Sequence, residues 1–155
     1  MTDAETSKPL LLLHAGALGD CVLAIHFARA VKAAVGAERV VLAARSPIAR
    51  WAAKRGLIDD CRDLDVIGMR HFFLDQPDPP EDVLAFFRGF GWIVSLLGGP
   101  DELIHRNLRA ITGQAFFCID PRPAERSATA PAHITRQWVD RLALPMGTDC
   151  ASAVT

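Results

Sequence analysis

The residues best suited to chemistry lie in one short turn near the amino end of the chain, His14-Ala-Gly-Ala-Leu-Gly-Asp20. Glycine lets a backbone turn tightly and approach a ligand. A helix that starts after such a turn offers free N–H groups to an anion. Asp20 is predicted to be the N-cap of this helix and also a carboxylate that can accept a proton. The turn therefore predicts a ligand site, with Gly16, Ala17, Leu18 and Gly19 as binding residues beside Asp20.

The turn departs from the two common phosphate loops. Its G-x-x-G-D pattern is neither G-x-G-x-x-G nor G-x-x-x-x-G-K-[ST]. Arg45 follows the second apolar run, where an NAD-binding protein would hold an acid for the ribose, so an NADP-type site stays open as an alternative. His14 is predicted to be a core histidine with its hydrogen bonds satisfied, and a ligand contact is the alternative.

Short apolar runs alternate with helical patterns along most of the chain, which predicts a mostly parallel sheet of about five or six strands with helices on both faces. The fold class is therefore α/β, a three-layer α/β/α domain over residues 9–144, with a disordered tail at 1–8 and a frayed tail at 145–155. The predicted strands are 10–15, 39–44, 61–66, 92–97 and 115–119, with a short extended piece at 71–74. The predicted helices are 20–35, 47–56 with Ser46 as its N-cap, 78–90, 100–113 and 132–144.

The carboxyl ends of parallel strands meet at one edge of the sheet, and ligands gather there. Arg45, Gly98 and Arg122 follow predicted strands, as the turn ending at Asp20 does. We therefore expect Arg45 and Arg122 to share one crevice mouth with Gly16 and Gly19, and to grip a phosphate or carboxylate there.

Composition narrows the class of protein further. The chain has 155 residues, a net charge of -1, 50% hydrophobic residues and 23% charged residues, as expected for a soluble globular domain. It lacks the basic excess of a nucleic-acid binder and any apolar run of the ~20 residues that a membrane helix needs. We expect a cytoplasmic protein. Its four cysteines form no C-x-x-C pair, so no metal site is predicted.

The stretch Leu11-Leu-Leu-His-Ala-Gly-Ala-Leu-Gly-Asp20, followed by an apolar helix, resembles the opening of the heptosyltransferases of lipopolysaccharide biosynthesis, glycosyltransferase family 9. Further similarities lie at Val41–Arg45, Gly56–Asp60, Trp92–Gly98 and Ile119–Pro123. The resemblance extends over about residues 9–144.

The resemblance implies one half of a GT-B fold, which consists of two Rossmann-like halves. The amino half holds the acceptor, a sugar lipid or a phosphorylated sugar, and the carboxy half holds the nucleotide-sugar donor. Asp20 would be the general base of an inverting transfer that uses no metal and no cofactor.

The chain ends near the point where the second half of that family begins. We therefore expect an acceptor-binding half that is inactive alone, with a donor-domain chain as partner in trans, weak self-association, and a place at the inner face of the membrane. The alternative is a non-catalytic Rossmann-like module that binds an anionic or nucleotide ligand or a protein partner.

Overall fold

The five strands in the described part of the chain run parallel in one sheet, as the alternating pattern predicts. The computed structural model describes residues 8–99, 101–112, 116–122 and 133–146. The strands pair in the order β3-β2-β1-β4-β5. Their bounds are Leu10–His14 for β1, Val40–Ala44 for β2, Asp60–Asp63 for β3, Trp92–Leu96 for β4 and Phe116–Cys118 for β5. Strand order and layers together define a Rossmann-like α/β fold.

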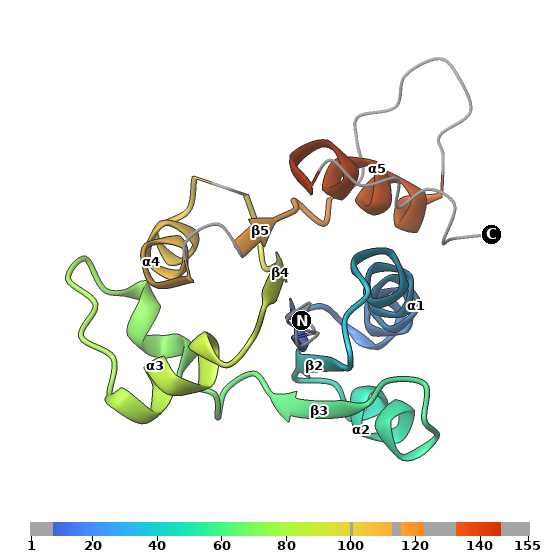
Figure 1. Ribbon diagram of the computed structural model, residues 1–155, viewed down its shortest axis with the longest axis horizontal. Coiled ribbons are helices and arrows are strands. Elements are labelled where there is room, and N and C mark those ends of the chain that lie inside the picture. The colour runs from blue at the N-terminus through green and yellow to red at the C-terminus, as the bar shows by residue number, and fades with distance from the viewer. Residues whose placement is uncertain (1–7, 100, 113–115, 123–132, 147–155) are drawn as a thin grey trace, which may run out of the picture.

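Helices cover both faces of this sheet (Figure 1). One face carries α1 (Leu18–Val35), α2 (Pro47–Lys54) and α5 (Ile134–Met146). The other carries the 3-10 helix η1 (Met69–Phe73), α3 (Glu81–Arg88) and α4 (Leu103–Thr112). The structure therefore has the three predicted layers.

Strand β1 is the centre of the fold, because it pairs with β2 on one side and β4 on the other. Its first four residues, Leu10–Leu13, are completely buried. Side chains alternate along a strand, so Leu10 and Leu12 pack toward α1 while Leu11 and Leu13 pack toward α4. His14 continues the first set, so the strand places it on the face that α1 and α5 cover.

The strand order also fixes where a ligand can bind. From β1 the chain passes to β2 and β3 on one side, and it later returns to β4 on the other side of β1. Loops at the carboxyl ends of β1 and β4 therefore lead away from each other, which opens a crevice between them. This switch point is where open α/β sheets bind their ligands.

The prediction that Asp20 is the N-cap of the first helix is wrong. Helix α1 begins at Leu18. Its N-cap is Ala17, which has extended backbone and makes no side-chain hydrogen bond to the helix. The chain is already helical when it reaches Gly19, so Asp20 becomes the third helical residue. A carboxylate in the first turn still interacts favourably with the helix dipole.

Two other predicted helix starts lie too early. Helix α3 begins at Glu81 after Pro80, not after Asp78, because a proline disfavours helical backbone in the residue before it, here Pro79. Helix α4 begins at Leu103, so Asp101 and Glu102 precede its first turn instead of forming it. Residues 100, 113 and 115, which bound predicted elements, lie outside the described residues.

Two predictions about apolar segments also need correction. Of the piece predicted as extended at 71–74, only Leu74 has extended backbone, while residues 71–73 belong to η1. Phe72 turns inward there and packs edge-on against Phe87 at 5.2 Å between ring centroids. The apolar spacing of Ile48, Trp51 and Ala52 predicts that these residues face the sheet, but Trp51 is 48% exposed, and Ala49 is buried on that side of α2 instead. The predicted cap of α2 is confirmed, since Ser46 Oγ accepts a hydrogen bond from the N–H of Ile48 at 3.3 Å.

The apolar spacing of Ile134, Trp138 and Leu142 predicts that the last helix packs inward through these residues. The structure confirms this, since Trp138 and Leu142 of α5 are buried and Ile134 is partly buried beside them. The Trp138 ring meets Phe27 of α1 edge-on at 5.7 Å, and its Nε1 donates a hydrogen bond to the Pro121 carbonyl at 3.1 Å. These contacts join α5 to both α1 and the segment after β5.

Replacing Trp138 by alanine is therefore expected to cost about 3–5 kcal/mol of unfolding free energy in urea, because a fully packed indole is removed. Trp51→Ala, at the half-exposed tryptophan, is the matched control and should cost less than about 1 kcal/mol. Equal losses for the two variants would show that α5 does not pack on the sheet in solution.

Candidate functional site

A cavity of about 440 Å³ lies at the switch point, beneath α5. We call it the switch-point cavity. Its lining mixes polar and apolar side chains, and the lining residues are His14, Gly16, Asp20, Leu96, Pro121, Arg122, Ile134 and Trp138. The volume suits a small-molecule ligand. Of the predicted site residues, the structure brings Gly16, Asp20 and Arg122 together on this cavity.

His14 is buried but makes no hydrogen bond, contrary to the sequence prediction of a satisfied core histidine. Only 2% of its surface is exposed, and its Nδ1 has no partner. Among the described residues, no hydrogen bond reaches either ring nitrogen. Buried polar side chains are nearly always hydrogen-bonded, so an unpartnered one at a cavity is a sign of function.

Gly16 brings His14 and Asp20 close together. A Cβ atom at this position would lie 2.6 Å from Cε1 and 2.8 Å from Nε2 of His14, and 2.9 Å from the Cβ of Asp20. These distances are shorter than carbon contacts allow, so a side chain at this position would push the imidazole and Asp20 apart. Glycine at position 16 therefore allows His14 and Asp20 to pack close together.

The charge state of His14 follows from this environment. Burial lowers the pKa of His14 below its ordinary value of 6.5, while the negative charge of Asp20 acts in the opposite direction. Burial is the larger effect, so the imidazole is neutral at neutral pH. A neutral imidazole can donate one hydrogen bond and accept another.

Arg122 lines the cavity, but its charge is already matched. Its Nε donates to Oδ1 of Asp120 at 2.9 Å, and its backbone N–H donates to the same oxygen at 3.0 Å. These hydrogen bonds lower the pKa of Asp120 to about 2. Arg122 therefore brings little uncompensated positive charge to the cavity.

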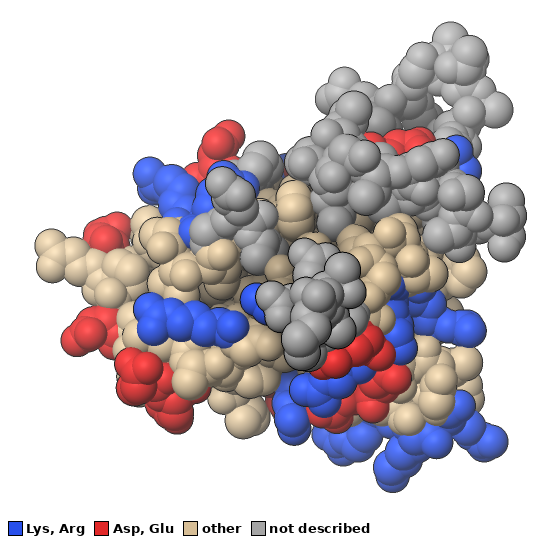
Figure 2. Space-filling model, in the orientation of Figure 1, with Lys and Arg blue, Asp and Glu red and all other residues tan. Residues whose placement is uncertain are grey.

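The structure does not bring Arg45 to the switch-point cavity. Arg45 lines a separate cavity of about 280 Å³ at the ends of β2 and β3, where it forms an ion pair with Asp65 at 2.8 Å. Arg50 and Arg62 line the same space, and basic side chains gather at this α2 end of the molecule (Figure 2). Because β2 and β4 lie on opposite sides of β1, the two arginines predicted to act together are separated.

The remaining predicted residues lie near the cavity without lining it. Ala17, Leu18 and Gly19 are exposed, and the N–H groups of Leu18 and Gly19 have no acceptor among the described residues. Gly98 has a φ of 153°, and a Cβ atom there would lie 2.2 Å from Oε1 of Glu102. The backbone conformation and the nearby carboxylate both favour glycine at this position, independently of any ligand.

A second buried histidine, His105 of α4, differs from His14 in having both ring nitrogens hydrogen-bonded. Its Nδ1 donates to the Gly99 carbonyl at 2.6 Å, which leaves Nε2 to accept from the Ser95 hydroxyl at 2.9 Å. The Cys118 thiol also contacts this ring at 3.3 Å, and burial raises the pKa of that thiol to about 11. This network fixes the loop after β4, and the sequence held no signal for it.

Within the described residues, no group of three His, Cys, Asp or Glu side chains is placed to hold a metal ion. None of the described helices is long and apolar enough to cross a bilayer.

The comparisons with known proteins add little to this geometry. No family model and no curated protein matches the chain. The structure is similar to that of prephenate dehydrogenase from A. aeolicus, solved in complex with hydroxyphenyl propionate and NAD+, with a TM-score of 0.38 and 13% sequence identity. The likeness covers 98% of this chain but 59% of that protein.

The two buried histidines predict opposite effects of substitution. His14→Leu should leave the unfolding free energy unchanged or raise it by about 1 kcal/mol, because it removes a buried polar group without a partner. His105→Leu should lower it by about 2–3 kcal/mol, because Ser95 and Gly99 lose their partner. Urea unfolding measures both free energies. A large loss for His14→Leu would contradict the finding that His14 makes no hydrogen bond to the described residues.

The lowered pKa of His14 also predicts how stability depends on pH. In the unfolded chain the His14 imidazole takes up a proton near pH 6.5, whereas in the folded chain it does so only at lower pH. Stability should therefore fall as pH drops through 6.5 and level off below the folded pKa. Unfolding free energies at pH 7.5 and 5.5 test this, and His14→Leu should show a smaller fall than the unchanged chain.

Proposed function

We propose that this domain is the acceptor-binding half of an inverting glycosyltransferase similar to the family 9 heptosyltransferases, with Asp20 as the general base. The observation that supports this most is the position of Asp20. It ends the turn that carries the resemblance, and it lines the switch-point cavity.

The mixed lining of the cavity suits a sugar ring. The lining combines the apolar side chains of Leu96, Ile134 and Trp138 with the polar side chains of His14, Asp20 and Arg122. A pyranose ring has C–H groups on its faces and hydroxyl groups around its edge. The apolar side chains can therefore cover C–H groups of the ring while the polar side chains bind its hydroxyl groups.

In the proposed reaction, Asp20 takes the proton of the acceptor hydroxyl as its oxygen attacks the anomeric carbon of the donor. The new glycosidic C–O bond forms as the bond to the nucleoside diphosphate breaks, and the diphosphate leaves with the electron pair. The exposed backbone of Ala17, Leu18 and Gly19 would border the acceptor. The donor would bind a second domain, which residues 1–155 do not supply.

The alternative, a module that binds an anion, is less well supported by the same geometry. The two arginines expected to form the anion site line different cavities. Arg122 is paired with Asp120, and Asp20 adds a negative charge at the cavity wall. A neutral hydroxylated ligand therefore suits the cavity better than an anion.

Asp20→Asn tests the proposed base. Asparagine keeps the shape but cannot accept the proton, so sugar transfer by the chain combined with a donor-binding domain should fall by about 10²-fold or more. The unfolding free energy should change by less than about 1 kcal/mol, since only a first-turn charge is lost.

Asp82→Asn is the matched control, because Asp82 also lies in the first turn of a helix, α3, but away from the cavity. It should leave transfer unchanged. Full activity of Asp20→Asn, or an equal loss in Asp82→Asn, would contradict the role of Asp20.

A further inference from the structure

We propose that His14 is a ligand-binding residue of the switch-point cavity, and that it hydrogen-bonds a hydroxyl group of a neutral sugar ring. The inference deepens the proposed function, since it names a further residue and the chemical class that it recognises. It requires ligand binding but not transfer, so the two claims can fail separately.

The first argument is the missing hydrogen bond. His14 at the end of β1 is nearly as buried as His105 of α4, which packs on β4 through Ser95. His105 has partners at both ring nitrogens, whereas Nδ1 of His14 has none. Nδ1 is itself fully buried, so the nitrogen that a ligand can reach is Nε2, which no described residue hydrogen-bonds. A hydroxyl group can both donate and accept, so it can pair with Nε2 in either tautomer of the neutral imidazole.

The second argument is access to the ring. His14 lines the cavity, and the neighbouring residue in the turn is Gly16. A side chain at position 16 would begin 2.8 Å from Nε2 of His14 and cover that edge of the ring. Because glycine has no side chain, the edge stays open. The same glycine keeps Asp20 beside the imidazole, so one ligand can contact both groups.

The third argument is charge. The charged residues that line the cavity are Asp20 of α1 and Arg122 after β5, and Arg122 is paired with Asp120. The lining therefore offers little unpaired positive charge, which disfavours a phosphate group. Hydroxyl groups carry no charge and can donate to the Asp20 carboxylate. A neutral sugar ring fits this lining better than a free phosphate or the phosphate group of a sugar phosphate.

Nuclear magnetic resonance of the full chain tests the assignment through the imidazole signals of His14. The probes are D-glucose, D-galactose and D-mannose, each added to about 100 mM, with inorganic phosphate as the separate anion. We expect at least one sugar to shift the His14 signals in a saturable way, and phosphate to leave them in place.

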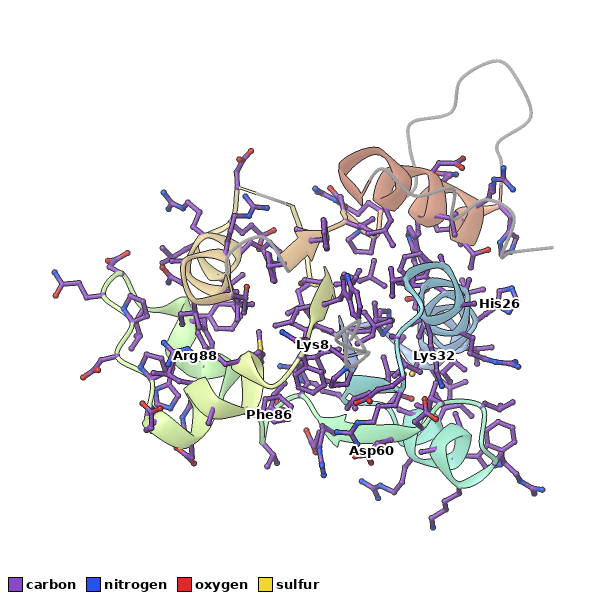
Figure 3. All side chains as sticks on the ribbon, in the orientation of Figure 1. Lys8, His26, Lys32, Asp60, Phe86 and Arg88 are labelled. Atoms are coloured by element: carbon purple, nitrogen blue, oxygen red, sulfur yellow. The ribbon has the colours of Figure 1, made fainter. Side chains whose placement is uncertain are left out.

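Variants supply the second readout. His14→Leu should weaken binding of that sugar by about 10-fold, the usual effect of losing one hydrogen bond. His26→Leu is the matched control, because His26 also lies on the amino half of the molecule but points away from the sheet on the outer side of α1 (Figure 3). It should bind the sugar as the unchanged chain does.

Three results would overturn the proposal: no sugar shifts His14, phosphate shifts it instead, or His14→Leu binds the sugar as tightly as the unchanged chain. If sugars bind through His14 while Asp20→Asn keeps full transfer, the proposed base is wrong and His14 still stands. If Asp20→Asn loses transfer but His14→Leu binds normally, only the role of His14 is wrong.

Discussion

Burial of β1 on both faces is the constraint on which the rest of the structure depends. Four consecutive leucines fill the centre of the sheet, and alternation along the strand sends two to each helical layer. The same alternation carries His14 to the layer formed by α1 and α5, at the carboxyl end of the strand. A polar ring thus ends an apolar strand at the switch point of the sheet, where no described residue hydrogen-bonds its nitrogens.

The two buried histidines show how the fold treats polar groups with and without a structural role. His105 connects β4 to the loop that follows it, and each of its nitrogens has a partner. His14 connects nothing, although it is almost as deeply buried. Leaving a polar group unpaired costs stability, and such costs concentrate at sites that bind or react. The contrast is therefore physical evidence for a site at β1, and it does not rest on likeness to another protein.

The sequence could predict the sheet and its helices because the apolar runs are short, continuous and separated by helical patterns. Helix starts were less predictable, since Asp20 and Asp78 each carry a start signal that backbone geometry overrides. Strand ends could be assigned, but not which of them face each other. Arg45 and Arg122 were expected together because both follow strands, yet the strand order separates β2 from β5. The missing partner of His14 depends on packing among distant segments, which no local pattern encodes.

The central claim is that a ligand satisfies His14 at the switch-point cavity. A high-resolution crystal structure of the chain with a bound sugar tests it most directly, because it locates every atom near the imidazole. The account predicts a sugar oxygen within about 3 Å of a His14 ring nitrogen, with the sugar ring in contact with Asp20 and Trp138. A structure in which His14 is hydrogen-bonded to a protein group, with the sugar bound elsewhere, would contradict it.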